Sequence, residues 1–274
     1  MKAYLSLIRI DLKLAFRQRV VIFFNLLMPL ALFMIFAEIN RTERIGGIGG
    51  VVTMVSVIGI LGTGLFGAGM RAAQEREANV LRRYKVAPIT PLPLLVASMV
   101  TGLAVYMPFV VLMLTVAHVR YGMNVPSNLA SVLVFIALGV TAIRSIGLIV
   151  GAVVNSTQES GILVQVLYMS MLFLSGATFP TQMFPAWLLK VSRFVPAAYI
   201  VNGLQSILLR HETLWTNWPG AAALLLTTAV GLLLSVKLFR WEKEEKLRPA
   251  AKLWLLAVLL PFALPGLWHL YTGA

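Results

Sequence analysis

Residues 129–154 read LASVLVFIALGVTAIRSIGLIVGAVV. Arg144 is the one charged residue in this stretch, and the run exceeds the roughly 20 apolar residues that a helix needs to cross the hydrocarbon of a bilayer. The run is continuously apolar, whereas the strands of membrane barrels alternate apolar and polar residues. Because unpaired backbone groups cannot face lipid, a helix is the remaining solution. The stretch therefore predicts a transmembrane helix.

The rest of the chain repeats this pattern. Hydrophobic residues make up 59% of the 274 positions and charged residues 12%, against about a quarter charged in soluble domains. A soluble fold could not cover so much apolar surface. We therefore predict an all-α, polytopic membrane protein with six transmembrane helices. The other five spans are predicted at Val20–Ala37, Val51–Met70, Leu92–Ala117, Ile162–Phe179 and Trp218–Val236.

A further apolar run near the C-terminus, Leu253–Tyr271, predicts a seventh span. Its length is close to the minimum for a crossing, and Pro261 and Pro265 weaken a straight helix. The alternative is a hairpin or surface helix whose end returns to the side on which it began.

Lys and Arg predict the orientation of the chain. With a cytoplasmic N-terminus, sixteen of the 23 basic residues lie in inside segments, six lie outside and Arg144 lies within a span. This asymmetry follows the positive-inside rule. We therefore attribute the net charge of +13 to membrane orientation and to contact with lipid head groups, and we expect no nucleic-acid partner. The location expected is a cell membrane, the inner membrane of a bacterium. Residues 1–19 predict an interfacial elbow helix that enters the first span.

The second connection, residues 71–91, reads RAAQEREANVLRRYKVAPITP. Nothing before Val86 is expected to break a helix, and Pro88 and Pro91 end it. Val80 and Tyr84 are four residues apart and so share one face. The segment predicts a short charged helix on the cytoplasmic side, suited to a groove on a partner protein. A surface helix that simply follows the charge bias is the alternative.

The segment 173–199 reads FLSGATFPTQMFPAWLLKVSRFVPAAY. Gly176 and Pro180 can end the fifth span early, and the stretch Met183–Val195 is too short to cross. This predicts a helix that dips into the outer leaflet and returns, with Trp187 as an interfacial anchor. An amphipathic helix lying flat on the outer surface is the alternative.

Arg144 is about ten residues, or about 15 Å, from the inner end of its span. Charges at that depth usually face a cavity or a partner, so we expect contact with an anionic substrate or with lipid. Snorkelling of the side chain to the inner interface is the alternative.

The chain has no phosphate-binding loop, no cysteine, and three isolated histidines. We therefore expect no catalytic residue and no bound metal or cofactor, and we do not expect an enzyme. Five glycines lie in the second span and predict close helix packing. They are Gly59, Gly62, Gly64, Gly67 and Gly69.

The chain resembles the permeases of the type-2 ABC exporter superfamily, which includes daunorubicin-resistance-like drug exporters. Three passages carry the resemblance, which covers residues 2–241. One is the basic elbow before a first span that contains Pro29. Residues 75–88 resemble the coupling helix, with Ala78-Asn79 where members usually have Gly-Thr. Residues 173–199 resemble the outer re-entrant signature, with Val195-Pro196 in place of Asn-Pro. The coupling residues implied are Glu75, Arg76, Glu77, Leu81, Arg82, Arg83 and Tyr84. The gate residues implied are Gly176, Phe179, Pro180, Met183, Phe184, Pro185, Trp187 and Pro196.

The resemblance implies the membrane subunit of an ATP-driven exporter. It would pair with a second permease copy or a paralogue and with a separate ABC ATPase subunit, which binds the ATP and Mg. Residues 1–241 would form the permease domain, and residues 242–274 a basic linker and an additional hydrophobic segment. The apolar spans favour an amphipathic drug, antibiotic, peptide or lipid as substrate. The alternatives are export of polysaccharide or ions, and an assembly scaffold without transport. A membrane enzyme acting on lipid would need clustered His, Asp or Ser residues, which the spans lack.

Overall fold

The computed structural model describes residues 2–40, 47–85, 90–124, 128–245, 249–263 and 266. Every regular element within these ranges is helical, as continuous apolar runs in a bilayer require. The first elements are α1 (Lys2–Arg17), α2 (Arg19–Ile22), η1 (Phe23–Leu27), α3 (Met28–Ile39), α4 (Gly47–Leu61), η2 (Gly62–Met70), α5 (Arg71–Glu77) and α6 (Val80–Lys85). Then follow α7 (Pro91–Tyr121), α8 (Leu129–Val153), α9 (Thr157–Leu174), η3 (Thr181–Met183), α10 (Ala186–Ser192), α11 (Pro196–Leu209), η4 (Leu214–Asn217), α12 (Trp218–Lys237) and η5 (Pro249–Leu259).

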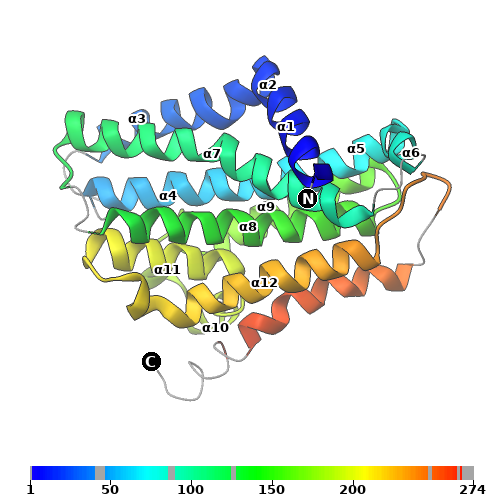
Figure 1. Cartoon of the computed structure of the whole chain (residues 1–274). Helices are drawn as coiled ribbons and strands as arrows, with labels where there is room; N and C mark the ends of the chain where they lie inside the picture. Colours follow the sequence, from blue (N-terminus) through cyan, green and yellow to red (C-terminus); the bar gives the residue numbers. More distant parts are fainter. Residues whose placement is uncertain are drawn as a thin grey trace.

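The long helices lie side by side and form a bundle, with α5 and α6 at one end (Figure 1). By length and composition, four helices of the described chain can cross a membrane: 47–77, 91–121, 129–153 and 214–237. Two predicted spans are shorter than these, at residues 23–39 and in α9. The all-α membrane fold is confirmed, and the number of six spans stays a prediction.

Helix α8 occupies the middle of the bundle, and 18 of its residues are buried. It packs mainly against η2 and α12. A helix that is apolar all round is expected to be buried on all sides. The sequence 129–154, which decides the fold class, therefore also forms the core.

The contact between η2 and α8 depends on glycine. A Cβ atom at Gly147 would lie 2.2 Å from the carbonyl oxygen of Gly64, and one at Gly69 would lie 2.8 Å from the carbonyl oxygen of Gly147. Backbones approach this closely in membranes where side chains are absent. The predicted packing role is confirmed for Gly64 and Gly69, whereas a Cβ at Gly62 would meet nothing within 4 Å.

Helix α1 is steeply inclined to the long helices (Figure 1) and packs against α7. Leu7 and Ala15 are buried on its inner side, while Leu5 and Ile10 are exposed. The helix ends at Arg17, and the chain changes direction before α2. This is the elbow that the amphipathic stretch predicts.

The described part of the C-terminal segment lies alongside α12 (Figure 1). Lys237 lies 5.3 Å from the ring centroid of Trp254, and the Phe262 ring lies 4.9 Å from that of Tyr199. Val258 and Phe262 are buried. The segment therefore packs against α12, α8 and Tyr199 of α11. Residues 264–265 and 267–271 of the predicted seventh span lie outside the described residues, and that crossing stays a prediction.

Candidate functional site

The predicted coupling segment consists of two helices rather than one. Helix α5 continues the helix 47–77 and ends at Glu77, and α6 begins at Val80. Between them Asn79 has a φ of 57°, in the left-handed region that asparagine tolerates better than most residues. The expectation of an unbroken helix up to Val86 was therefore wrong. Val86 and Pro88 lie outside the described residues.

Arg76 points into the protein and binds the end of α8. It is 4% exposed. Its Nη1 donates to the carbonyl oxygen of Gly151 at 2.7 Å, and its Nη2 donates to that of Val154 at 2.6 Å. The last carbonyls of a helix have no partner within it and carry partial negative charge. Arg76 therefore caps the C-terminal end of α8.

Arg240, which follows α12, binds the same helix end. Its guanidinium donates to the carbonyl oxygens of Ala152 (2.8 Å) and Val154 and to Oδ1 of Asn155 (2.8 Å). Burial lowers the pKa of Arg240, although arginine stays protonated in proteins. Two arginines from distant parts of the chain thus hold the turn between α8 and α9; we call this contact the arginine clamp.

Glu77 joins the coupling segment to α9. Its Oε2 accepts a hydrogen bond of 3.0 Å from the backbone N–H of Thr157, at the first turn of α9. Ser156 caps this helix start by accepting from the backbone N–H of Glu159, and the Glu159 carboxylate accepts from the backbone N–H of Asn155. A carboxylate near a helix N-terminus is favourable because of the helix dipole. A displacement of α5 would therefore act on α8 and α9 together.

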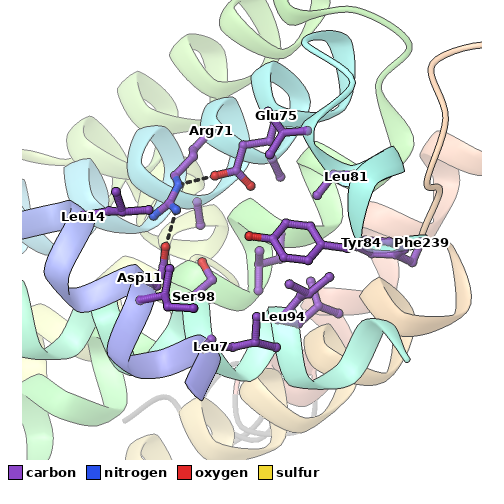
Figure 2. Close-up of a pocket in the computed structure, with 17 residues that line it drawn as sticks. Leu7, Asp11, Leu14, Arg71, Glu75, Leu81, Tyr84, Leu94, Ser98 and Phe239 are labelled. Atoms are coloured by element: carbon purple, nitrogen blue, oxygen red, sulfur yellow. Dashed lines mark hydrogen bonds and ion pairs between the residues drawn. The ribbon is translucent and has the colours of Figure 1, made fainter. Parts of the chain in front are cut away.

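On the opposite side of α5, an ion-pair network connects it to the N-terminal helix. Arg71 binds Asp11 of α1 and Glu75, the latter at 2.6 Å. These three side chains are among those that line a cavity of about 140 Å³ (Figure 2). Leu81 is buried in its wall, and the ring of Tyr84 lies across it. Leu81 and Tyr84 of α6 thus pack within the chain, whereas Val80 is exposed.

Arg82 and Arg83 are exposed on α6. Among the predicted coupling residues, these two charges and Glu77 are exposed, whereas Arg76 and Leu81 are buried. The exposed arginines therefore form a basic surface on α6, and Leu81 and Tyr84 pack the same helix against the rest of the chain.

The predicted gate segment contains only short helices before α11. Gly176 has a φ of 82°, which suits glycine and ends the helical run of α9. Phe179 stacks on Phe173 with centroids 5.9 Å apart. The seven residues of α10 cannot cross a bilayer. Met183 and Trp187 are exposed by 74% and 65%.

The prolines of this segment sit at helix starts. Pro180 and Pro185 precede η3 and α10, and Pro196 is the first residue of α11. Proline is favourable there because the first N–H groups of a helix have no internal partner. Phe184 lies between the two short helices. The predicted gate residues thus lie in one region of short helices between α9 and the start of α11.

Arg144 lies in the interior, between α8, η2 and α7. It is 3% exposed and donates to the carbonyl oxygen of Thr63 at 2.8 Å and to Oγ of Ser98 at 3.0 Å. The side chain therefore lies in the interior and does not extend to the inner interface, and its contact with an anionic substrate or lipid stays a prediction.

Sequence reasoning missed Asp11 and Arg240 as members of these networks. Asp11 is the one acidic residue among basic and apolar ones in 1–19, a signal that was available. Arg240 gave no such signal, since it lies in a basic cluster and its partners are mostly backbone carbonyls.

Comparison with known protein families shows the family of this chain. The sequence model described as "ABC-2 family transporter protein" matches residues 32–237, well over half of the chain. The chain belongs to the ABC-2 family of transporter proteins. Its family and its apolar helices make it a multi-pass membrane protein.

Two curated relatives of this ABC-2 family member carry the same name, "Inner membrane transport permease YhhJ", from Escherichia coli (strain K12) and Shigella flexneri. Each is 26% identical over 176 residues, which cover 64% of this chain and 46% of the relative. The chain thus matches about half the length of these relatives.

Proposed function

We propose that this chain is the membrane subunit of an ATP-driven exporter and that a separate ATPase, which binds ATP and Mg, docks on α6. The observation that carries the proposal is the pair of exposed arginines, Arg82 and Arg83, on a helix tied to the bundle core. Through Arg76 and Glu77 the preceding helix contacts α8 and α9. A force applied at α6 would therefore reach two long helices.

The orientation belongs to this proposal. The basic end of the bundle, with α5 and α6, faces the cytoplasm, together with the N-terminus. The relatives named as inner membrane permeases support a bacterial inner membrane as the location. Residues 1–241 then act as the permease domain, followed by the basic linker and the C-terminal segment.

A second permease, identical or paralogous, is the partner within the membrane. Helix α9 supports this because one of its faces is apolar and uncovered: Ile162, Val166, Met169 and Phe173 are spaced three or four residues apart and are 38–62% exposed. The substrate path would lie between the two copies. The short helices of the gate segment would close it on the outer side.

The substrate class proposed is an amphipathic drug, antibiotic, peptide or lipid. The bundle presents mostly apolar side chains with few charges, which suits a molecule with a large apolar part. An exporter of polysaccharide or ions would be indicated if the purified complex hydrolysed ATP without any response to amphiphiles. An assembly scaffold would be indicated if no ATPase bound to the chain.

Reversing both exposed charges, with Arg82→Glu and Arg83→Glu, is expected to reduce ATPase binding and amphiphile-stimulated ATP hydrolysis at least tenfold. The reason is that a like-charge contact replaces an attractive one at the docking surface. The measurement is co-purification of the ATPase with the permease, followed by turnover in proteoliposomes.

The matched control reverses two exposed charges elsewhere, Arg120→Glu and Lys190→Glu. It should leave ATPase binding unchanged. Normal binding and stimulation in the Arg82/Arg83 variant would contradict the docking proposal, provided that the variant elutes as a folded protein.

The gate segment can be placed by cysteine labelling because the chain has no cysteine. We expect a membrane-impermeant maleimide to label Lys190→Cys from outside intact cells. Arg83→Cys, the control at the opposite end, should react only after the inner face is opened. Labelling of both positions from the same side would rule out the outer location of α10.

A further inference from the structure

A second cavity, of about 440 Å³, lies between the N-terminal segment, η2 and α7. Leu14, Val21 and Val105 form apolar walls, and the guanidinium of Arg144 lies in the polar wall. Leu14 and Gln18 are exposed, so the cavity reaches the protein surface beside α1. The Arg71–Glu75 ion pair separates it from the smaller cavity near Tyr84.

The guanidinium of Arg144 has unused binding capacity. Its Nη1 and Nη2 donate to Thr63 and Ser98, but its buried Nε has no hydrogen-bond partner. The hydroxyl of Thr101, which also lines the cavity, is buried and unpartnered as well. Unsatisfied buried polar groups are rare in native proteins and call for an explanation.

Within the described residues no carboxylate is hydrogen-bonded to Arg144. Its hydrogen-bond acceptors there are neutral, a carbonyl and hydroxyls. The carboxylates that face this region, Asp11 and Glu75, are both bound by Arg71. A cation inside a membrane is costly without a partner and usually marks a functional site.

The neighbouring helix leaves room for this arginine. A Cβ atom at Gly102 of α7 would lie 2.1 Å from Cζ of Arg144, so the guanidinium rests directly on the α7 backbone. A side chain at 102 would push the guanidinium away. Glycine at position 102 therefore leaves the space that the guanidinium occupies at the cavity wall.

From these observations we infer that the cavity binds the anionic head group of an amphiphile, a phosphate or a carboxylate, at Arg144. The apolar walls and the opening beside the exposed Leu14 suit an acyl chain that leads into the membrane. A bidentate or forked contact to an oxyanion is the interaction that guanidinium favours. The site belongs to this chain alone and does not require the proposed ATPase.

The test uses the full chain, purified in a neutral detergent, and three probes that separate the parts of the ligand. Dioleoyl phosphatidylglycerol carries anion and chains, dioleoylglycerol carries chains alone, and inorganic phosphate carries the anion alone. Native mass spectrometry measures binding. We expect phosphatidylglycerol to bind at least tenfold more tightly than either other probe.

Two variants then assign the site. Arg144→Gln should remove the preference for phosphatidylglycerol over dioleoylglycerol, and Arg144→Lys should keep part of it. Val105→Phe adds bulk to the apolar wall of the cavity while Arg144 itself is kept, and it should weaken phosphatidylglycerol binding about tenfold. Val111→Phe, at a 53% exposed position of the same helix, is the matched control and should bind as the unmodified chain does.

Three results would overturn the inference. They are equal binding of phosphatidylglycerol and dioleoylglycerol by the unmodified chain, equal binding of inorganic phosphate and phosphatidylglycerol, and unchanged binding in Val105→Phe. If Arg144→Gln fails to fold, the cavity-filling variant decides. ATPase docking can fail while this binding persists, so the two proposals are separable.

Discussion

Replacing Arg76 with leucine is expected to lower the free energy of unfolding by about 3 kcal/mol or more. The substitution removes two hydrogen bonds from a buried charged group, each worth about 1.5–3 kcal/mol. It also leaves the carbonyl of Gly151 in the interior without its donor. The carbonyl of Val154 still accepts a hydrogen bond from Arg240. The destabilisation therefore comes mainly from the unpaired carbonyl of Gly151 and from the loss of a contact that holds the turn between α8 and α9.

The measurement is the midpoint of unfolding of the purified chain in mixed micelles. Arg82→Leu is the matched control because the same side chain is removed from the same segment at an exposed position; its effect should stay within about 0.5 kcal/mol. Arg76→Lys should recover only part of the stability, since an ammonium group is a point charge that lacks the fork of donors. Equal midpoints for Arg76→Leu and Arg82→Leu would show that the arginine clamp does not stabilise the fold.

If the docking proposal holds, the same substitution has a second consequence. Arg76→Leu would leave the exposed arginines of α6 in place and remove the hydrogen bonds of Arg76 to the end of α8. ATPase binding should then persist while stimulated turnover falls. This separates the predicted coupling residues into a docking pair, Arg82 and Arg83, and a buried connection, Arg76 and Glu77.

The sequence predicts the fold class because the physical signal is strong. Continuous apolar runs such as 129–154 leave a helix as the one acceptable backbone structure in lipid. The positions of the gate prolines also follow from sequence, since proline is favourable at the first turn of a helix and Pro196 occupies that place in α11. Helix ends are less predictable, because tertiary contacts decide them.

The coupling segment shows where prediction fails. A single left-handed residue, Asn79, divides it, and propensity alone does not require that break. The inward orientation of the Arg76 side chain could not be predicted either. Its partners are backbone carbonyls 75 and 78 positions away, and backbone groups leave no trace in the sequence. For Arg144, composition left a choice between the interior and the interface, and the neighbouring glycine and hydroxyl groups decided it.

The glycine contact between η2 and α8 should be among the least tolerant places in the chain. A Cβ atom at Gly147 would lie 2.2 Å from the carbonyl oxygen of Gly64 and 3.1 Å from the backbone nitrogen of Gly69. Both neighbours are backbone, so no side-chain rotation can relieve the overlap. Inserting even one methyl group into a close-packed core costs about 1–3 kcal/mol, and here two long helices must separate to admit it.

Gly147→Ala is therefore expected to lower the free energy of unfolding by about 3 kcal/mol, and Gly147→Leu to prevent recovery of monodisperse protein. The control is Gly62→Ala, the same chemical change in η2 at a position where a Cβ meets nothing within 4 Å. Because alanine favours a helix over glycine by about 1 kcal/mol, this variant should be neutral or slightly more stable. Unfolding midpoints measured side by side decide the matter. If Gly147→Ala and Gly62→Ala have the same unfolding midpoint, the backbone contact between η2 and α8 does not stabilise the bundle.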